Sequence, residues 1–222
     1  NATAAQPVCL VNEGFWGMKF EKSKTYHLSL FAKGSHNKYT GHVYAVLLAN
    51  DGKTAVSYTI ALTGEVFTDK WNKLTAELTA NNTDLSGQLL LLTDRGGHLY
   101  LDVVSLFPDT WNNRPNGLRP DLAQLLADTK PTFLRFPGGC FVEGQNSFDD
   151  TWQWKRTIGP IEQRHGHMSY NWNYWSSDGL GFDEYLQLAE DLGAAPLFVV
   201  NVGLGHGWYV PMADLDTLVQ TT

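Results

Sequence analysis

The stretch FLRFPGGC, residues 133–140, combines a short apolar run with an abrupt stop. Its first four residues are typical of a buried strand, whereas Pro137-Gly138-Gly139 cannot continue a regular strand. One charged residue, Arg135, lies inside the apolar run. The stretch therefore predicts a buried strand that ends sharply in a loop, with a cationic side chain close to that end.

The sequence around this stretch predicts alternating helices and strands. LRPDLAQLLADTK predicts a helix with Leu122, Leu125 and Leu126 on one side. GFDEYLQLAEDLG predicts a second helix that ends at Gly193, and APLFVVNVG predicts a strand covered on both faces. Helix, strand, helix, strand over residues 108–222 is the order found in a parallel sheet with helical crossovers.

Two strand ends contain the candidate binding residues. In folds of this class, such residues collect at the carboxyl ends of parallel strands. Arg135 can donate a fork of hydrogen bonds to a carboxylate or to sugar hydroxyls, and Gly139 lets the backbone approach a ligand. Cys140 ends the same segment, and Asn201 lies at the next strand end. Structural alternatives stay open: a buried ion pair for Arg135, a small core residue for Cys140 and a structural amide for Asn201.

Residues 1–107 have a different pattern. TYHLSLFAKG places four apolar residues on one face of a predicted strand: Tyr26, Leu28, Leu30 and Ala32. HVYAVLLAND, KLTAELTA and HLYLDVVSLF predict further strands, which turn sequences separate. Strands at this spacing indicate an antiparallel β-sandwich with no helix of substantial length.

The tryptophans allow two interpretations, because flat rings suit both sugar stacking and core packing. For Trp16, Trp71 and the tyrosines of the predicted sandwich, packing in the core is the favoured interpretation and a sugar-binding platform is the alternative. Residues 152–175 form a loop-rich stretch beside the predicted strand ends and contain four more tryptophans, at positions 152, 154, 172 and 175. For these four, stacking on sugar and packing beneath a loop both stay open.

Composition excludes two classes of partner and predicts no cofactor. The net charge of the 222 residues is -7, without a basic block for nucleic acid or an apolar run that could span a bilayer. Cys9 and Cys140 have no ligand-type neighbour at zinc spacing. His165 and His167 of RHGH lack a third ligand nearby, which favours a polar loop. GLGHG, residues 203–207, lacks the full dinucleotide-binding fingerprint, so neither a metal nor a cofactor is expected.

Two Asn-x-Thr sequons indicate a secreted protein. They lie at Asn1 and at Asn81, the latter in the polar segment TANNTDLSG. A glycan requires an exposed turn, which this segment predicts. We therefore expect an extracellular location with glycosylation at Asn1 and Asn81.

Four motifs resemble one family of enzymes. LFPDTWNNRPNGLRPDL, FLRFPGGCFVEG, WQWKRTIGPIEQR and DGLGFDEYLQLAEDLGAAPLFVVNVG run in order over most of residues 105–205. They are similar to the α-L-arabinofuranosidases of glycoside hydrolase family fifty-one, in particular to the larger, eukaryotic-type members. The preceding sandwich resembles the carbohydrate-binding-module-like jelly roll that these members insert near the start of their barrel.

The resemblance implies a multidomain protein: a sandwich over residues 1–107, and part of a (β/α)8 TIM barrel over residues 108–222. It implies release of terminal arabinofuranosyl groups from arabinan or arabinoxylan with retention of anomeric configuration, which requires one glutamate as nucleophile and another as acid/base. By motif position, Arg135, Gly139 and Cys140 border the arabinose-binding pocket, with Asn201 at the next strand end.

The expected catalytic glutamates are not recognisable in this chain. In the family the acid/base follows an asparagine at a barrel strand end, but the Asn-Glu pair here, Asn12-Glu13, lies in the sandwich region. Residues 108–222 contain two recognisable strands, whereas a barrel usually takes about 250 residues. We therefore expect a second polypeptide, the remainder of the same enzyme, to complete the barrel and supply both glutamates. The alternative is a non-catalytic glycan-binding module with a barrel remnant.

Overall fold

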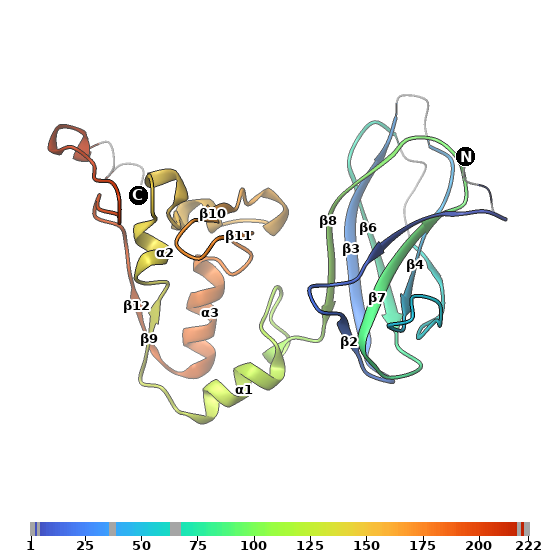
Figure 1. The fold of residues 1–222 in the computed structure, drawn as a ribbon. Helices are drawn as coiled ribbons and strands as arrows, with labels where there is room; N and C mark the ends of the chain where they lie inside the picture. The colour runs from blue at the N-terminus through green and yellow to red at the C-terminus, as the bar shows by residue number, and fades with distance from the viewer. Residues whose placement is uncertain (1–2, 4, 36–38, 63–67, 217–218, 220–222) are drawn as a thin grey trace. The chain divides into compact units, whose positions relative to one another are not determined.

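The computed structural model describes residue 3 and residues 5–35, 39–62, 68–216 and 219. The chain divides into two compact units (Figure 1). Unit 1 comprises Asn1–Asp109 and unit 2 comprises Thr110–Thr222. Each unit is described by itself.

Unit 1 is an antiparallel sandwich of two sheets. Its strands are β1 (Val8–Asn12), β2 (Met18–Phe20), β3 (Thr25–Gly34), β4 (Val43–Leu48), β5 (Ile60–Ala61), β6 (Asn72–Thr79), β7 (Asp84–Thr93) and β8 (Leu99–Pro108). One sheet has the order β1-β7-β4-β5, with β2 also paired to β7, and the other has the order β6-β3-β8. No helix occurs among the described residues of this unit, as the sequence predicts.

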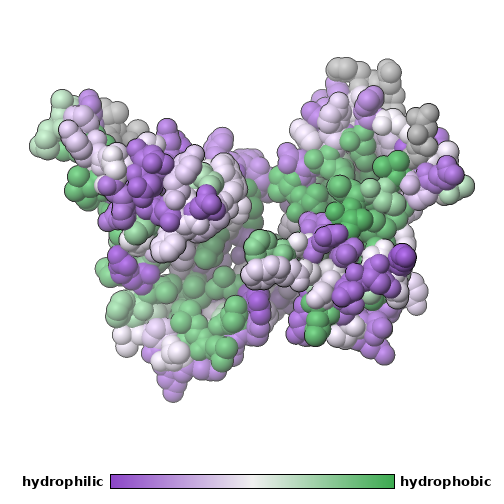
Figure 2. All heavy atoms as spheres, viewed as in Figure 1, coloured by the Kyte–Doolittle hydropathy of each residue, from purple (hydrophilic) through white to green (hydrophobic). Residues whose placement is uncertain are grey.

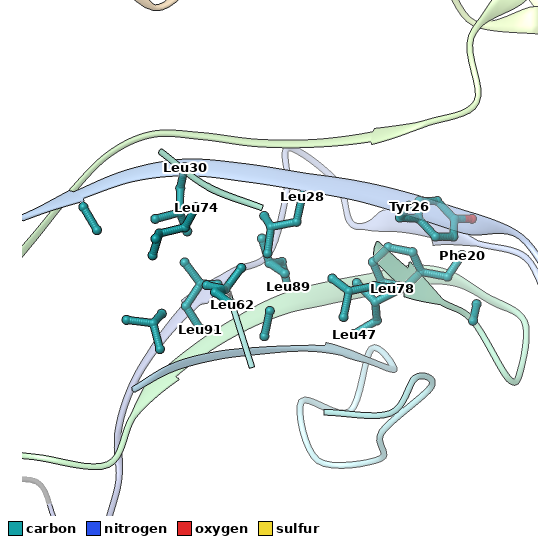
Figure 3. Close-up of a cluster of buried hydrophobic side chains, with 14 of the residues drawn as sticks. Phe20, Tyr26, Leu28, Leu30, Leu47, Leu62, Leu74, Leu78, Leu89 and Leu91 are labelled. Carbon is teal, nitrogen blue, oxygen red and sulfur yellow. The ribbon is translucent and has the colours of Figure 1, made fainter. Parts of the chain in front are cut away.

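The core of unit 1 lies between the two sheets (Figure 3). Alternate residues of β3 point inward, and Leu28 and Leu30 are almost fully buried, in agreement with the predicted alternation. They pack against Leu74 from β6 and against Leu47 and Leu89 from the facing sheet. Burial of these side chains is the main source of stability for the unit.

The two tryptophans of unit 1 lie outside this core, so the core prediction for Trp16 and Trp71 is wrong. Trp16 is 86% exposed beside Phe15, with the two ring centroids 4.6 Å apart. Trp71 is partly exposed and Lys33 Nζ lies 4.7 Å from its ring centroid, a cation–π arrangement. Both residues adjoin turns, where a large ring does not reach the space between the sheets.

Among its described residues, unit 2 contains a parallel strand pair, α-helices and long connections. Its regular elements are α1 (Pro120–Asp128), β9 (Phe133–Phe136), α2 (Cys140–Glu143), β10 (His167–Ser169), β11 (Tyr174–Ser176), α3 (Phe182–Leu192) and β12 (Ala195–Phe198). Single 3-10 turns are η1 (Trp111–Asn113), η2 (Phe148–Asp150), η3 (Trp154–Thr157), η4 (Ile161–Gln163) and η5 (Met212–Asp214). In the described part of the chain, none of the helices has the length and apolar character that crossing a membrane requires.

Strands β9 and β12 pair in parallel, and helix α3 packs against one face of the pair (Figure 1). Phe136 of β9 is buried against α3, and its ring stacks on Tyr185 at a centroid distance of 4.8 Å. Phe182 of α3 contacts Phe198 of β12 edge to face, also at 4.8 Å. Gly193 ends α3 in the left-handed conformation, as the sequence predicts.

The opposite face of the strand pair is bare in the described residues. Phe133 and Leu197 on this face are 60% and 51% exposed. Within the described residues, the prediction that the second strand is covered on both faces is therefore wrong. On α1, Leu122 and Leu125 are likewise exposed, although they share one side as predicted. Figure 2 shows hydrophobic residues at the surface of both units.

Candidate active site

The carboxyl ends of β9 and β12 lie next to each other. The strands pair in parallel, with Arg135 opposite Leu197 and Phe136 opposite Phe198. The pairing extends one residue further, because the Val199 amide donates to the Phe136 carbonyl at 2.8 Å. The loops that begin at Pro137 and Val199 therefore leave from the same edge, where binding residues of parallel sheets gather.

Arg135 lies on the bare face of this pair. Side chains alternate along a strand, so Arg135 shares the face of Phe133, opposite to the face on which Phe136 packs against α3. The Arg135 guanidinium lies over Gly138, where a Cβ atom would collide with it. Within the described residues Arg135 has neither a hydrogen-bond partner nor an ion-pair partner, so its five donors are available.

The two glycines after β9 have backbone conformations that favour glycine. Gly138 has φ +78 and Gly139 has φ +54. Space around Gly139 is open, because a Cβ atom added there would meet no heavy atom within 4 Å beyond its chain neighbours. Cys140 follows as the first residue of α2, with a free, half-buried thiol. This loop therefore presents backbone and thiol with little covering them.

Asn201 is held by backbone groups on both sides. Its Nδ2 donates to the carbonyls of Val142 at 2.9 Å and Leu204 at 3.1 Å, while its Oδ1 accepts from the Gly203 amide at 2.6 Å. These bonds join the loop after β12 to α2. The geometry gives Asn201 a structural role, and contact with a ligand stays a prediction.

A hollow of about 250 Å³ lies beside the end of β12. Asn201 lines it together with Val199 and Val200, and Phe148, Trp152, Gln153, Trp154, Lys155 and Arg156 form the rest of the wall. Arg135, Gly139 and Cys140 do not line this hollow. The four tryptophans of the loop-rich stretch differ in environment: Trp152 is buried, Trp154 is half-buried, and Trp172 and Trp175 are exposed.

The structure brings a residue that is distant in the sequence next to two residues of α2. Cys140 and Glu143 of α2 lie beside His206 of the loop after β12, and one ligand-type atom from each lies within 4.8 Å of the others. Sequence reasoning missed the group because His206 is distant along the chain from Cys140.

His167, predicted in a polar loop, is instead buried in β10 with its Nδ1 3.0 Å from Asp178, which corrects that prediction.

The buried and half-buried aspartates in the described part of unit 2 include three with structural partners. Asp150 accepts backbone hydrogen bonds from three successive amides, of residues 145–147. Asp178 accepts from the Ser176 hydroxyl at 3.1 Å, and Asp191 accepts twice from Arg114. Partners of this kind stabilise the loops and helix ends rather than leave a carboxylate open to a substrate.

Glu184 of α3 forms an ion pair with Arg164 that is almost enclosed. Its Oε1 lies 2.8 Å from Arg164 Nη2, and both side chains are nearly buried. Burial raises the pKa of Glu184, but hydrogen bonds from Arg164, Asn116 and the Gly181 amide outweigh burial and leave the pKa below its ordinary value. The pair ties the loop at Arg164 to the start of α3.

Glu184→Gln should lower the free energy of unfolding of the intact protein at neutral pH by about 3 kcal/mol, because Arg164 would lose its buried counter-charge. A carboxyl with a lowered folded pKa contributes stability above its unfolded pKa and loses it as pH falls through the folded pKa. The difference between wild type and variant should therefore shrink below about pH 4. Thermal unfolding from pH 7 to pH 3 measures this, with the exposed Glu190→Gln as control. An equal difference at every pH would contradict it.

The known proteins that this chain is similar to include several named alpha-L-arabinofuranosidases. Residues 125–222 match the family model described as an alpha-L-arabinofuranosidase 1 domain. The chain is 40% identical over 217 residues to alpha-L-arabinofuranosidase 1 of Arabidopsis thaliana, covering 96% of this chain and 31% of that protein. It is 38% identical over 205 residues to the extracellular exo-alpha-L-arabinofuranosidase of Streptomyces chartreusis, covering 86% of this chain and 23% of that protein.

A solved structure extends the similarity to the fold. An arabinose-bound MgGH51 α-L-arabinofuranosidase matches with a TM-score of 0.87 and 35% identity, covering 97% of this chain and 35% of that chain. The chain thus spans 31% of the length of the first curated relative and 35% of the structural one. It resembles the α-L-arabinofuranosidases of glycoside hydrolase family 51, of which it covers a part.

Proposed function

We propose that this chain is part of a retaining glycoside hydrolase that releases terminal α-L-arabinofuranosyl residues from arabinan or arabinoxylan. The observation that carries the proposal is the likeness to an arabinose-bound α-L-arabinofuranosidase over 97% of the chain, at 35% identity. Arg135 supports it, because an arginine with free donors at a parallel strand end suits recognition of carboxylates and hydroxyls.

Unit 2 is proposed to be part of a (β/α)8 barrel. Its β9 and β12 are parallel and α3 covers one face of them, which is the arrangement of a barrel segment. The bare face with Phe133 and Leu197 would then point into the barrel interior, which in such folds is filled by side chains from all strands. Further polypeptide, the remainder of the same enzyme, would cover this face and pair with the open strand edges.

The catalytic carboxylates are proposed to come from that further polypeptide. Retention requires a nucleophile and an acid/base about 5 Å apart, and the buried carboxylates of unit 2 serve structural roles. Arg135 would orient these carboxyl groups by charge-assisted hydrogen bonds and keep the nucleophile ionised, while the acid/base holds the proton that it gives to the leaving group. Gly139 and Cys140 would border the sugar, and the Cys140 backbone amide can bind a hydroxyl whatever its side chain. Asn201 would hold the neighbouring loop in place.

Unit 1 is proposed to be a carbohydrate-binding-module-like jelly roll. Phe15 and Trp16 are strongly exposed beside a hollow of about 330 Å³ whose other lining residues include Glu13, Asn50 and Gln88. Exposed rings beside polar groups suit glycan stacking. This observation also supports the alternative of a purely glycan-binding protein, which the activity measurement below separates from the enzyme.

Secretion is proposed from the sequons and from the extracellular relative of Streptomyces chartreusis. Asn81 follows β6 and is exposed, so a glycan can be accommodated there. Asn1 lies outside the described residues. Mass spectrometry of the protein secreted from a eukaryotic host should find a glycan on each of the two asparagines, and an unmodified Asn81 would contradict the proposal.

Hydrolysis of an aryl α-L-arabinofuranoside by the full-length protein that contains this chain tests the function. We expect release of arabinose with retained configuration. NMR of the first product formed measures its anomeric configuration. An aryl β-D-xylopyranoside is the control substrate and should be cleaved far more slowly. A full-length protein that binds arabinan but cleaves neither substrate would refute the enzyme and support the binding module.

A further inference from the structure

Three side chains that can bind a metal ion converge beside the end of β9. One ligand-type atom from each of Cys140, Glu143 and His206 lies within 4.8 Å of the others. Glu143 Oε2 and His206 Nε2 are already 3.0 Å apart. Cys140 and Glu143 are three residues apart in α2, so their side chains are neighbours on the helix surface.

The chain holds these ligands in place from two sides. The His206 amide donates to the Gly144 carbonyl at 3.2 Å, directly after α2. Asn201 bonds the start of the same loop to the Val142 carbonyl at 2.9 Å. Gly205 passes so close to the Glu143 carbonyl that a Cβ atom there would collide with it. The backbone at His206 is therefore held beside α2 by these contacts, and the imidazole is held there by its ion pair with Glu143.

We propose that Cys140, Glu143 and His206 form a binding site for a borderline divalent cation of the Zn²⁺ class. A thiolate, an imidazole nitrogen and a carboxylate oxygen are ligands that Zn²⁺ accepts, whereas Ca²⁺ and Mg²⁺ prefer oxygen alone. Three protein ligands leave one position of a tetrahedral ion open for water or a substrate hydroxyl. Glu143 and His206 are exposed and Cys140 is half-buried, so an ion can enter from solvent. Binding releases the thiol proton of Cys140.

The consequence for catalysis rests on the proposed function. Cys140 is placed there at the border of the sugar pocket, so a cation on its sulfur would occupy space that the arabinosyl group needs. Zn²⁺ should therefore act as an inhibitor that raises KM for the arabinoside, and His206→Gln should relieve the inhibition. Inhibition of equal strength in His206→Gln would refute this consequence.

Cobalt spectroscopy on the full-length protein tests the site without any activity measurement. Co²⁺, a probe for Zn²⁺ sites, should produce a near-ultraviolet thiolate-to-metal band that Zn²⁺ displaces. Cys140→Ser should abolish the band, and His206→Gln should weaken Co²⁺ binding by about a hundredfold, since even outer-shell partners contribute about 10–100-fold. Cys9→Ser and His165→Gln are matched controls outside the group and should change neither.

The outcomes separate the site from the function. No band, or a band that persists in Cys140→Ser, would overturn the metal site even if the protein hydrolyses arabinosides. An affinity unchanged in His206→Gln would overturn the three-residue assignment. A band with the expected variant effects in a protein that cleaves no arabinoside would leave the metal site standing and refute the proposed function alone.

Discussion

Arg135→Ala should lower kcat/KM of the full-length enzyme for an aryl α-L-arabinofuranoside by two to three orders of magnitude, about the loss that follows removal of one positioned donor from an active site. Arg135 lies on the bare face of β9 and has no partner within the described residues, so the side chain contributes little to folding. The melting temperature should therefore change little. Steady-state kinetics with a parallel thermal melt measure both effects.

Two further variants define what Arg135 does. Arg135→Lys keeps the charge but loses the planar fork, so it should recover only a small part of the activity if bidentate contacts matter. Arg119→Ala removes an exposed arginine that pairs with Asp121 and is the matched control, which should retain normal kinetics. Normal kinetics in Arg135→Ala would remove Arg135 from the site.

Unit 2 produced alone, as residues 110–222, should fail to fold cooperatively, whereas unit 1 should fold. The strand pair has a bare apolar face with Phe133 and Leu197, and α1 exposes Leu122 and Leu125. Two strands with open edges and an uncovered apolar face fall short of what independent stability requires. Unit 1 encloses its own core between two sheets.

Dye binding and thermal melts of the two fragments measure this difference. For unit 2 we expect strong fluorescence with a hydrophobic dye and no cooperative transition, and for unit 1 a single sharp transition. A sharp transition in unit 2 alone, without dye binding, would show that it is self-sufficient and would contradict the proposed barrel segment.

Local patterns predicted the elements in which one periodicity dominates. The alternation in β3 and the glycine that ends α3 correspond to what the structure contains, because near neighbours in the chain determine both. Strands β1 and β7 were missed, since the residues of β1 are exposed and β7 contains a long leucine run without clear alternation. Burial was the weaker prediction: Trp16 and Leu197 are apolar but exposed, and a side chain's surroundings depend on distant segments.

In the candidate site, too, some residues could be predicted from local sequence and others could not. Arg135 and Cys140 could be selected from one strand end, because a strand followed by Pro-Gly-Gly is a local signal. The contact of His206 with Glu143 could not be found in this way, since it depends on β12 pairing with β9 and on Asn201 holding the loop. Only the folded chain brings these residues together.

The most direct measurement is covalent labelling of the full-length protein with an arabinofuranosyl inactivator that traps the nucleophile of retaining enzymes. If unit 2 is one part of a barrel whose glutamates lie on further polypeptide, the label will be found by peptide mass mapping on a glutamate outside residues 1–222. Labelling of Arg135→Ala should be much slower. A label on a carboxylate within residues 1–222 would contradict the proposed division of the active site.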